Sequence, residues 1–85
     1  MIELNCRVCG IYLEESPWGE DGNCPTYEMC TCCGVEFGNQ DYTVESVKRY
    51  REKWLSDGAK WSLPKFKPSD WDLNEQMKNI PKEYL

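Results

Sequence analysis

The chain has 85 residues, six of them cysteines, and a net charge of −5 at neutral pH. A chain of this length forms a single domain with a small apolar core, which disulfides or a bound metal commonly reinforce. No stretch approaches the roughly 20 apolar residues of a membrane span, and no basic, apolar secretion signal is visible at the start.

The charge is unevenly distributed along the chain. Residues 1–45 hold nine acidic side chains and one arginine, a net charge of −8, whereas residues 46–85 hold nine basic and six acidic side chains, a net charge of +3. Nucleic-acid affinity depends largely on neutralising phosphates. We therefore expect the first part of the chain to repel nucleic acid.

Two short cysteine motifs of the pattern C-x-x-C-G occupy Cys6–Gly10 and Cys30–Gly34, and twenty residues separate the two cysteine pairs. We expect a cytoplasmic protein, and in that compartment cysteine clusters bind metal more often than they form disulfides. Paired C-x-x-C motifs at this spacing are typical of a tetrahedral zinc site. The glycine of each motif can adopt a positive φ where the chain leaves the turn. We predict that one zinc ion, or alternatively iron, binds the four cysteines Cys6, Cys9, Cys30 and Cys33.

Two further cysteines lie outside this pattern. Cys30 and Cys33 are preferred over Cys32 because they repeat the spacing of the first motif. In the competing assignment Cys32 replaces one of them as a ligand. Cys24 is interpreted as a free thiol in a loop, with a Cys24–Cys32 disulfide only under oxidising conditions. The sequence does not fix the roles of Cys24 and Cys32.

Residues 11–15 and 26–29 are rich in branched and aromatic side chains, which favours β-strands. The glycine, proline, aspartate and asparagine between them, in residues 16–23, are typical of loops. These features predict a β-hairpin with a long loop, in which each strand is joined to one cysteine motif. A second loop is expected at residues 38–41.

A helix is predicted to follow. Thr43 can cap it, Glu45 suits its first turn, and Gly58 is a plausible end. Helical spacing places four apolar residues near one face of this helix, and either Tyr50 or Arg51 completes that face. The four apolar residues are Val44, Val47, Trp54 and Leu55.

The end of the chain contains a second predicted helix. Two prolines in residues 60–68 favour an irregular segment. The helix then starts at Ser69 or Asp72 and ends at Pro81. Its apolar residues are Leu73, Met77 and Ile80.

Together these features predict a small α+β domain held by a metal. Residues 1–42 form a zinc-ribbon or rubredoxin-like β-hairpin with two cysteine turns, and residues 43–85 form a helical, tryptophan-rich extension packed on it. The four tryptophans are interpreted as core residues. The alternative is that one or two of them are exposed anchors for a partner. The tryptophans are Trp18, Trp54, Trp61 and Trp71.

The residues from Cys6–Gly10 through Cys30–Gly38, followed by Arg51–Trp54 and Gly58–Trp61, resemble the small bacterial cysteine-rich CPCC-type proteins. The similarity covers most of the chain, but Thr31 stands where the name of that family requires proline. It implies a zinc-ribbon-like domain without an established activity and, as for some relatives, a role as an immunity or accessory protein in toxin systems.

A second resemblance is to rubredoxins. These proteins also have two C-x-x-C-G turns, often with an aromatic residue soon after the first glycine, as Tyr12 is here. The resemblance implies that the same four sulfurs hold iron and carry one electron. It does not account for residues 43–85.

The expected function is that of a structural zinc protein that binds another protein. A four-cysteine site has no open position at which to activate water, and the chain contains no histidine to act as a base. We therefore expect no enzymatic activity. The alternatives are a rubredoxin-like electron carrier and a nucleic-acid-binding zinc ribbon, although a solvated helix face equally explains the basic residues Lys48, Arg49, Arg51 and Lys53. The sequence predicts neither the partner nor the oligomeric state.

Overall fold

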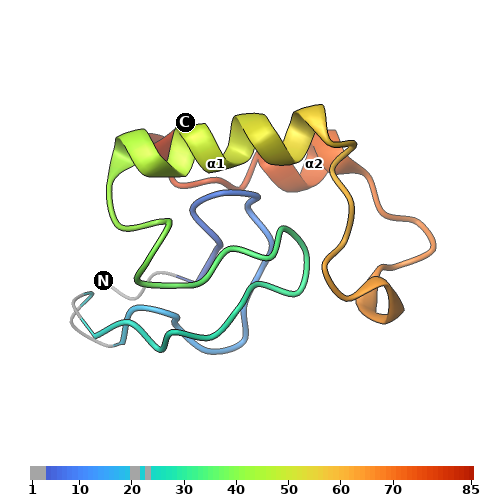
Figure 1. Cartoon of the computed structure of the whole chain (residues 1–85). Coiled ribbons are helices and arrows are strands. Elements are labelled where there is room, and N and C mark those ends of the chain that lie inside the picture. The colour runs from blue at the N-terminus through green and yellow to red at the C-terminus, as the bar shows by residue number, and fades with distance from the viewer. Residues whose placement is uncertain (1–3, 20–21, 23) are drawn as a thin grey trace.

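The structure is a computed structural model that describes residues 4–19, 22 and 24–85. Its longest element, helix α1 (Val44–Ser56), lies across one side of the irregular chain that precedes it (Figure 1). Helix α2 (Leu73–Met77) and two single turns of 3-10 helix, η1 (Pro64–Phe66) and η2 (Lys82–Tyr84), complete the elements. No helix in the described part of the chain is long and apolar enough to cross a lipid bilayer.

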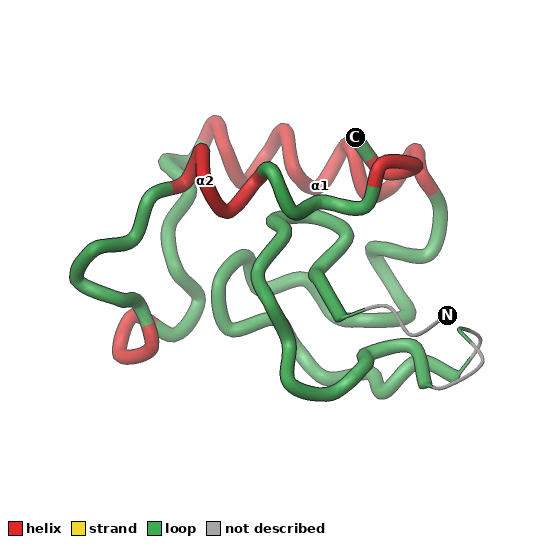
Figure 2. The backbone as a smooth tube through the Cα atoms, turned by 180° about the vertical axis from the view of Figure 1, so that it is seen from behind, coloured by secondary structure: helices red, strands yellow, loops and turns green. Residues whose placement is uncertain are grey.

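The predicted β-hairpin is wrong. In the described residues no β-strand forms, and Figure 2 shows loops and turns outside the helical segments. Two isolated antiparallel bridges join Asn5 to Tyr12 and Met29 to Glu36. Each bridge pairs the residue before a cysteine motif with one just after it. Because the backbone groups are satisfied locally in this way, no hydrogen bond of the described residues joins 11–15 to 26–29, and the ribbon is not supported.

The start of α1 agrees with the prediction. Thr43 is the N-cap, and its side-chain oxygen accepts a hydrogen bond from the Ser46 N–H at 3.1 Å. The Ser46 hydroxyl in turn accepts from the Thr43 N–H at 3.3 Å. This reciprocal pair is a capping box that satisfies two backbone donors which the helix itself leaves unpaired.

The buried face of α1 is narrower than the apolar pattern predicts. Val47, Arg51 and Trp54 are its buried residues. Val44 and Leu55, which border this stripe, are exposed. Of the two residues proposed to complete the face, the charged Arg51 is buried and Tyr50 is half-buried.

The core is built around the cysteines. Three of the four tryptophans are buried, and the half-buried Trp71 meets Trp61 edge to face with the ring centroids 5.6 Å apart. This supports the interpretation of the tryptophans as core residues. The other buried core residues are Cys6, Val8, Cys9, Cys30, Cys32, Cys33, Val35, Phe37, Val47, Ala59, Ile80 and Tyr84.

The C-terminal helix is shorter than expected. Asp72, rather than Ser69, caps α2, and its carboxylate accepts a hydrogen bond from the Glu75 N–H at 3.2 Å. The helix ends at Met77, so that Ile80 lies beyond it. Ile80 is nevertheless buried, because it packs closely against Gly10 of the first cysteine motif.

The buried Arg7 contacts the loop that precedes α1. The Arg7 guanidinium lies over the ring of Trp18 at 3.8 Å from its centroid and over that of Tyr84 at 4.5 Å. It also donates to the backbone carbonyl of Asp41 at 3.0 Å. Burial raises the pKa of the Asp41 carboxyl, although the Gly38 N–H and the charge of Arg7 oppose this shift. Arg7 thus connects the first cysteine motif to both the 38–41 loop and the end of the chain.

Candidate metal centre

The two cysteine motifs fold into the same local structure. In each, the glycine N–H donates to the carbonyl of the first cysteine, at 2.9 Å in Gly10 and 3.0 Å in Gly34. The N–H of that first cysteine donates to the residue after the glycine, at 3.0 Å and 2.9 Å. The two glycines have φ values of +83° and +82°, a region that favours glycine. One turn geometry is therefore used twice, as the repeated C-x-x-C-G pattern suggests.

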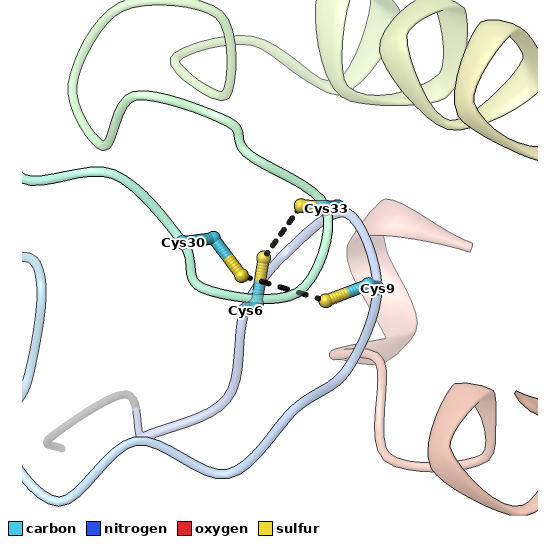
Figure 3. A group of neighbouring side chains, drawn as sticks. All are labelled: Cys6, Cys9, Cys30 and Cys33. Atoms are coloured by element: carbon cyan, nitrogen blue, oxygen red, sulfur yellow. Dashed lines mark hydrogen bonds between the residues drawn. The ribbon is translucent and has the colours of Figure 1, made fainter. Parts of the chain in front are cut away.

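The two turns bring four sulfurs to one point. Figure 3 shows the side chains of Cys6 and Cys9 from the first turn facing those of Cys30 and Cys33 from the second. The Sγ atoms of Cys6 and Cys33 are 3.7 Å apart, as are those of Cys9 and Cys30. All four sulfurs lie within 4.8 Å of one another, and all four residues are buried. The structure thus brings together the four cysteines selected from the sequence.

This spacing fits a tetrahedral metal and not a disulfide. Bonds of about 2.3 Å from a central metal, at tetrahedral angles, place two sulfurs roughly 3.8 Å apart. A disulfide requires about 2.05 Å between its sulfurs, and all six cysteines are free. The cluster can therefore hold a metal ion. Tetrahedral four-thiolate geometry is shared by zinc and iron, so the distances do not distinguish the two.

The cysteines of the cluster alter one another's pKa. Among the protein groups alone, burial raises the pKa of the Cys9 and Cys33 thiols. Hydrogen bonds from Cys33, Cys6 and Cys9 instead lower the pKa of Cys30. Cys30 thus ionises more readily than Cys9 and Cys33. A divalent cation removes this difference, because all four sulfurs bind it as thiolates and release their protons.

The two remaining cysteines differ from each other. Cys24 is exposed, consistent with a free thiol in a loop. Cys32 is fully buried, and its sulfur accepts a hydrogen bond from the Gln76 side-chain amide at 3.4 Å. Neither belongs to the four-sulfur cluster of the described residues.

Arg51 holds the backbone of the first cysteine turn. Its guanidinium donates from Nε to the Val8 carbonyl at 2.7 Å and from Nη2 to the Arg7 carbonyl at 2.9 Å. Nη2 also donates to the Tyr84 carbonyl at 2.5 Å. Burial lowers the pKa of Arg51, while the charges of nearby cysteines raise it. Arg51 therefore fixes the turn and places a positive charge beside the sulfurs.

Two more side chains from the second half of the chain support the turns. The Tyr50 hydroxyl donates to the Cys33 carbonyl at 3.1 Å. The Gln76 amide donates to the Cys9 carbonyl at 3.1 Å, and its oxygen accepts from the Trp71 indole N–H at 2.7 Å. The role of Gln76 cannot be recognised from the sequence, since an isolated glutamine carries no pattern. Arg51 could have been recognised, because it is a charged residue at a position where the helical spacing requires burial.

Comparison with known proteins finds a similar bacterial protein. The chain is similar to the uncharacterised protein YoaQ of Bacillus subtilis (strain 168), with 28% identity over 96 aligned positions that cover 93% of this chain and 76% of that protein. No family model matches the chain. No solved structure matches it either. The resemblance to the CPCC-type proteins therefore rests on the residues that carry it.

The arrangement limits what the centre can do chemically. The cysteine most exposed among the four, Cys33, has only 6% of its surface accessible to solvent. Four thiolates fill the positions of a tetrahedron, so that a bound ion has no position for water or a substrate. Such a centre can hold two segments of chain together, but it offers no site at which a bound metal could activate water.

Proposed function

We propose that this chain is a structural zinc protein, in which one ion bound by Cys6, Cys9, Cys30 and Cys33 holds the two cysteine turns together. The observation that carries the proposal is the convergence of four buried sulfurs from two identical turns. A closed four-thiolate set is typical of structural zinc. The hydrogen bonds that Tyr50, Arg51 and Gln76 donate to backbone carbonyls of the two turns support a structural role.

We further propose that the protein acts by binding another protein and has no enzymatic activity. The support is the closed site, the absence of histidine from the sequence and the strongly acidic first part of the chain. An acidic surface steers association with a basic partner. The resemblance to the CPCC-type proteins supports an immunity or accessory role. A pull-down at low salt that retains no protein would count against this second proposal.

The metal proposal is tested by elemental analysis of protein purified under reducing conditions, together with thiol counting. We expect one zinc per chain and no iron. In the folded protein Cys24 should react readily with a thiol reagent, and Cys32 only after unfolding, because it is buried. A metal-free folded protein, or sulfurs joined as disulfides, would contradict the proposal.

The alternatives give distinct results in the same preparation. A red protein with one iron per chain would identify the rubredoxin-like carrier. The nucleic-acid alternative relies on four basic residues of α1, and two of them are already engaged within the protein. Arg51 is buried, and Arg49 forms an ion pair with Glu45 at 2.9 Å. Binding to an oligonucleotide that weakens steeply with added salt would revive it.

A further inference from the structure

A groove of about 270 Å³ runs between residues 13–17 and residues 26–31, the two segments that the predicted hairpin would have joined. We call it the acidic groove, because the carboxylates of Glu14, Glu15 and Glu28 line it. All three side chains are exposed. None of them forms an ion pair with another described residue. The groove therefore presents uncompensated negative charge.

The acidic groove also has an apolar lining. Leu13, Pro17 and Phe37 contribute to it, and Met29 contributes although 62% of its surface is exposed. Apolar surface of this kind, bordered by polar groups, is characteristic of interaction sites. A matching occupant needs positive charges next to an apolar side chain.

The chain itself carries such a segment. Residues 62–67, the basic loop, include Lys65 and Lys67, and no acidic residue occurs from 58 to 69. Leu63 and Phe66 of this loop are 43% and 55% exposed. In both views the chain between α1 and α2, which contains the loop, projects to one side of the molecule (Figures 1 and 2).

The basic loop is held in place at its base. The Ser62 N–H donates to the Cys32 carbonyl at 2.8 Å, and the Leu63 N–H donates to the Thr31 carbonyl at 2.9 Å. The η1 turn closes the loop through hydrogen bonds from Phe66 and Lys67. A segment ordered in this way loses little conformational freedom when it docks, which lowers the cost of binding.

We infer that two copies of this chain associate by placing the basic loop of each over the acidic groove of the other. Thr31 lines the groove and also anchors the loop, so the two surfaces adjoin. Adjoining complementary surfaces allow a two-fold arrangement in which both contacts form at once and the assembly closes as a dimer. Lys65 and Lys67 then face the glutamates, and Leu63 and Phe66 cover the apolar lining.

Dimerisation of this kind requires only the folded chain, whatever the identity of the metal or of a partner protein. Because few residues take part and several are charged, the association should be weak and sensitive to salt. A basic segment of a different protein would suit the same groove, and the test separates the two occupants.

The experiment is sedimentation of the metal-loaded protein at about 0.1 mM chain, a concentration suited to weak association. At low salt the average mass should rise from the 10.0 kDa of one chain toward twice that value. It should fall back to that of a monomer in about 0.5 M salt, where exposed charges are screened. A monomer at low salt, or a dimer indifferent to salt, would overturn the inference. If the protein is a monomer at low salt, a basic segment of a partner protein would remain the candidate occupant of the acidic groove.

Charge-reversal variants identify the surfaces. Glu15→Lys with Glu28→Lys, and separately Lys65→Glu with Lys67→Glu, should each weaken dimerisation at least about tenfold. An equimolar mixture of the two double variants should associate again, because in a mixed dimer each of the two contacts then pairs opposite charges. Lys48→Glu on α1 is the control and should leave the dimer unchanged. Equal sedimentation of all variants, or no recovery of association in the mixture, would refute the proposed contact. The metal content and the near-ultraviolet dichroism of each variant verify that it is folded.

Discussion

Arg51 is a charged residue in the interior, with 8% of its surface exposed, and it interacts with backbone carbonyls rather than with a carboxylate. Its three hydrogen bonds reach the first cysteine turn and the last turn of the chain. Burying a guanidinium is costly unless its donors are satisfied. The sulfur cluster nearby offsets part of that cost, since the negative charges of its cysteines favour the charged guanidinium.

Replacing Arg51 with methionine should therefore destabilise the protein. The Arg7, Val8 and Tyr84 carbonyls lose the donor that the guanidinium supplies. We expect a loss of about 3 kcal/mol in the free energy of unfolding, because buried acceptors that lose their donors are expensive. Denaturant unfolding of the metal-loaded protein measures the change.

The matched control is Arg49→Met on the same helix. Arg49 makes an exposed ion pair with Glu45, and such pairs contribute no more than about 0.5 kcal/mol. Equal losses in the two variants would mean that the hydrogen bonds of Arg51 to the cysteine turn contribute nothing specific.

The cysteine turns depend on a close approach of the chain at Gly10. A Cβ added there would overlap the backbone oxygen of Gln76 and crowd Ile80. The residue also has a φ of +83°, which side chains disfavour. Glycine is therefore needed at this position for two reasons: its backbone has a positive φ, and the segment around α2 packs too closely to leave room for a side chain.

Gly10→Ala should cost clearly more than Gly58→Ala. Gly58 has a similar φ of +99°, but an added Cβ there would meet only the side chain of Lys60 at an ordinary contact distance. We expect about 1 kcal/mol for Gly58→Ala, from backbone strain alone. For Gly10→Ala we expect roughly 2 kcal/mol more, because the packed segment must move. Thermal unfolding of the two variants measures the difference, and equal losses would show that the close approach is not significant.

The elements could be predicted where the signal is local. The Thr43 cap and the end of α1 near Gly58 follow from short-range hydrogen bonding and backbone preference, and both agree with the structure. The hairpin could not be predicted in this way. Its β-prone residues suit any half-buried extended chain. The tight turn at each glycine favours a local bridge across its own cysteine motif over pairing between residues 11–15 and 26–29.

The sequence predicts the four-cysteine cluster better than it predicts the residues that surround the cluster. Regular spacing identifies the four cysteines, because chelation by a short turn imposes that spacing. Residues that hold the first turn come from positions more than forty residues away, as the bonds from Arg51 to Val8 and from Gln76 to Cys9 show. Such contacts arise only from the packing of the complete chain, and no local pattern encodes them.

Removal of the metal should therefore unfold the molecule. The buried core consists largely of cysteines and of the side chains packed around them, and the described part contains no sheet that could hold it together. A helix of 13 residues such as α1 is marginal on its own. Binding of structural zinc contributes about 10 kcal/mol or more, which is comparable with the entire stability of a small domain. We expect chelation to abolish the near-ultraviolet dichroism of the buried tryptophans, and one equivalent of zinc to restore it.

Single cysteine variants distinguish loss of the metal from a general effect of the chelator. Cys9→Ser and Cys33→Ser remove a cluster sulfur, so both should remain largely unfolded and metal-poor even with zinc present. Cys24→Ser changes an exposed thiol outside the cluster, and its stability should stay within about 0.5 kcal/mol of the parent. Equal damage in all three would mean that the four-sulfur cluster is not the metal site. A demetallated protein that keeps its near-ultraviolet signal would mean that side-chain packing alone determines the fold.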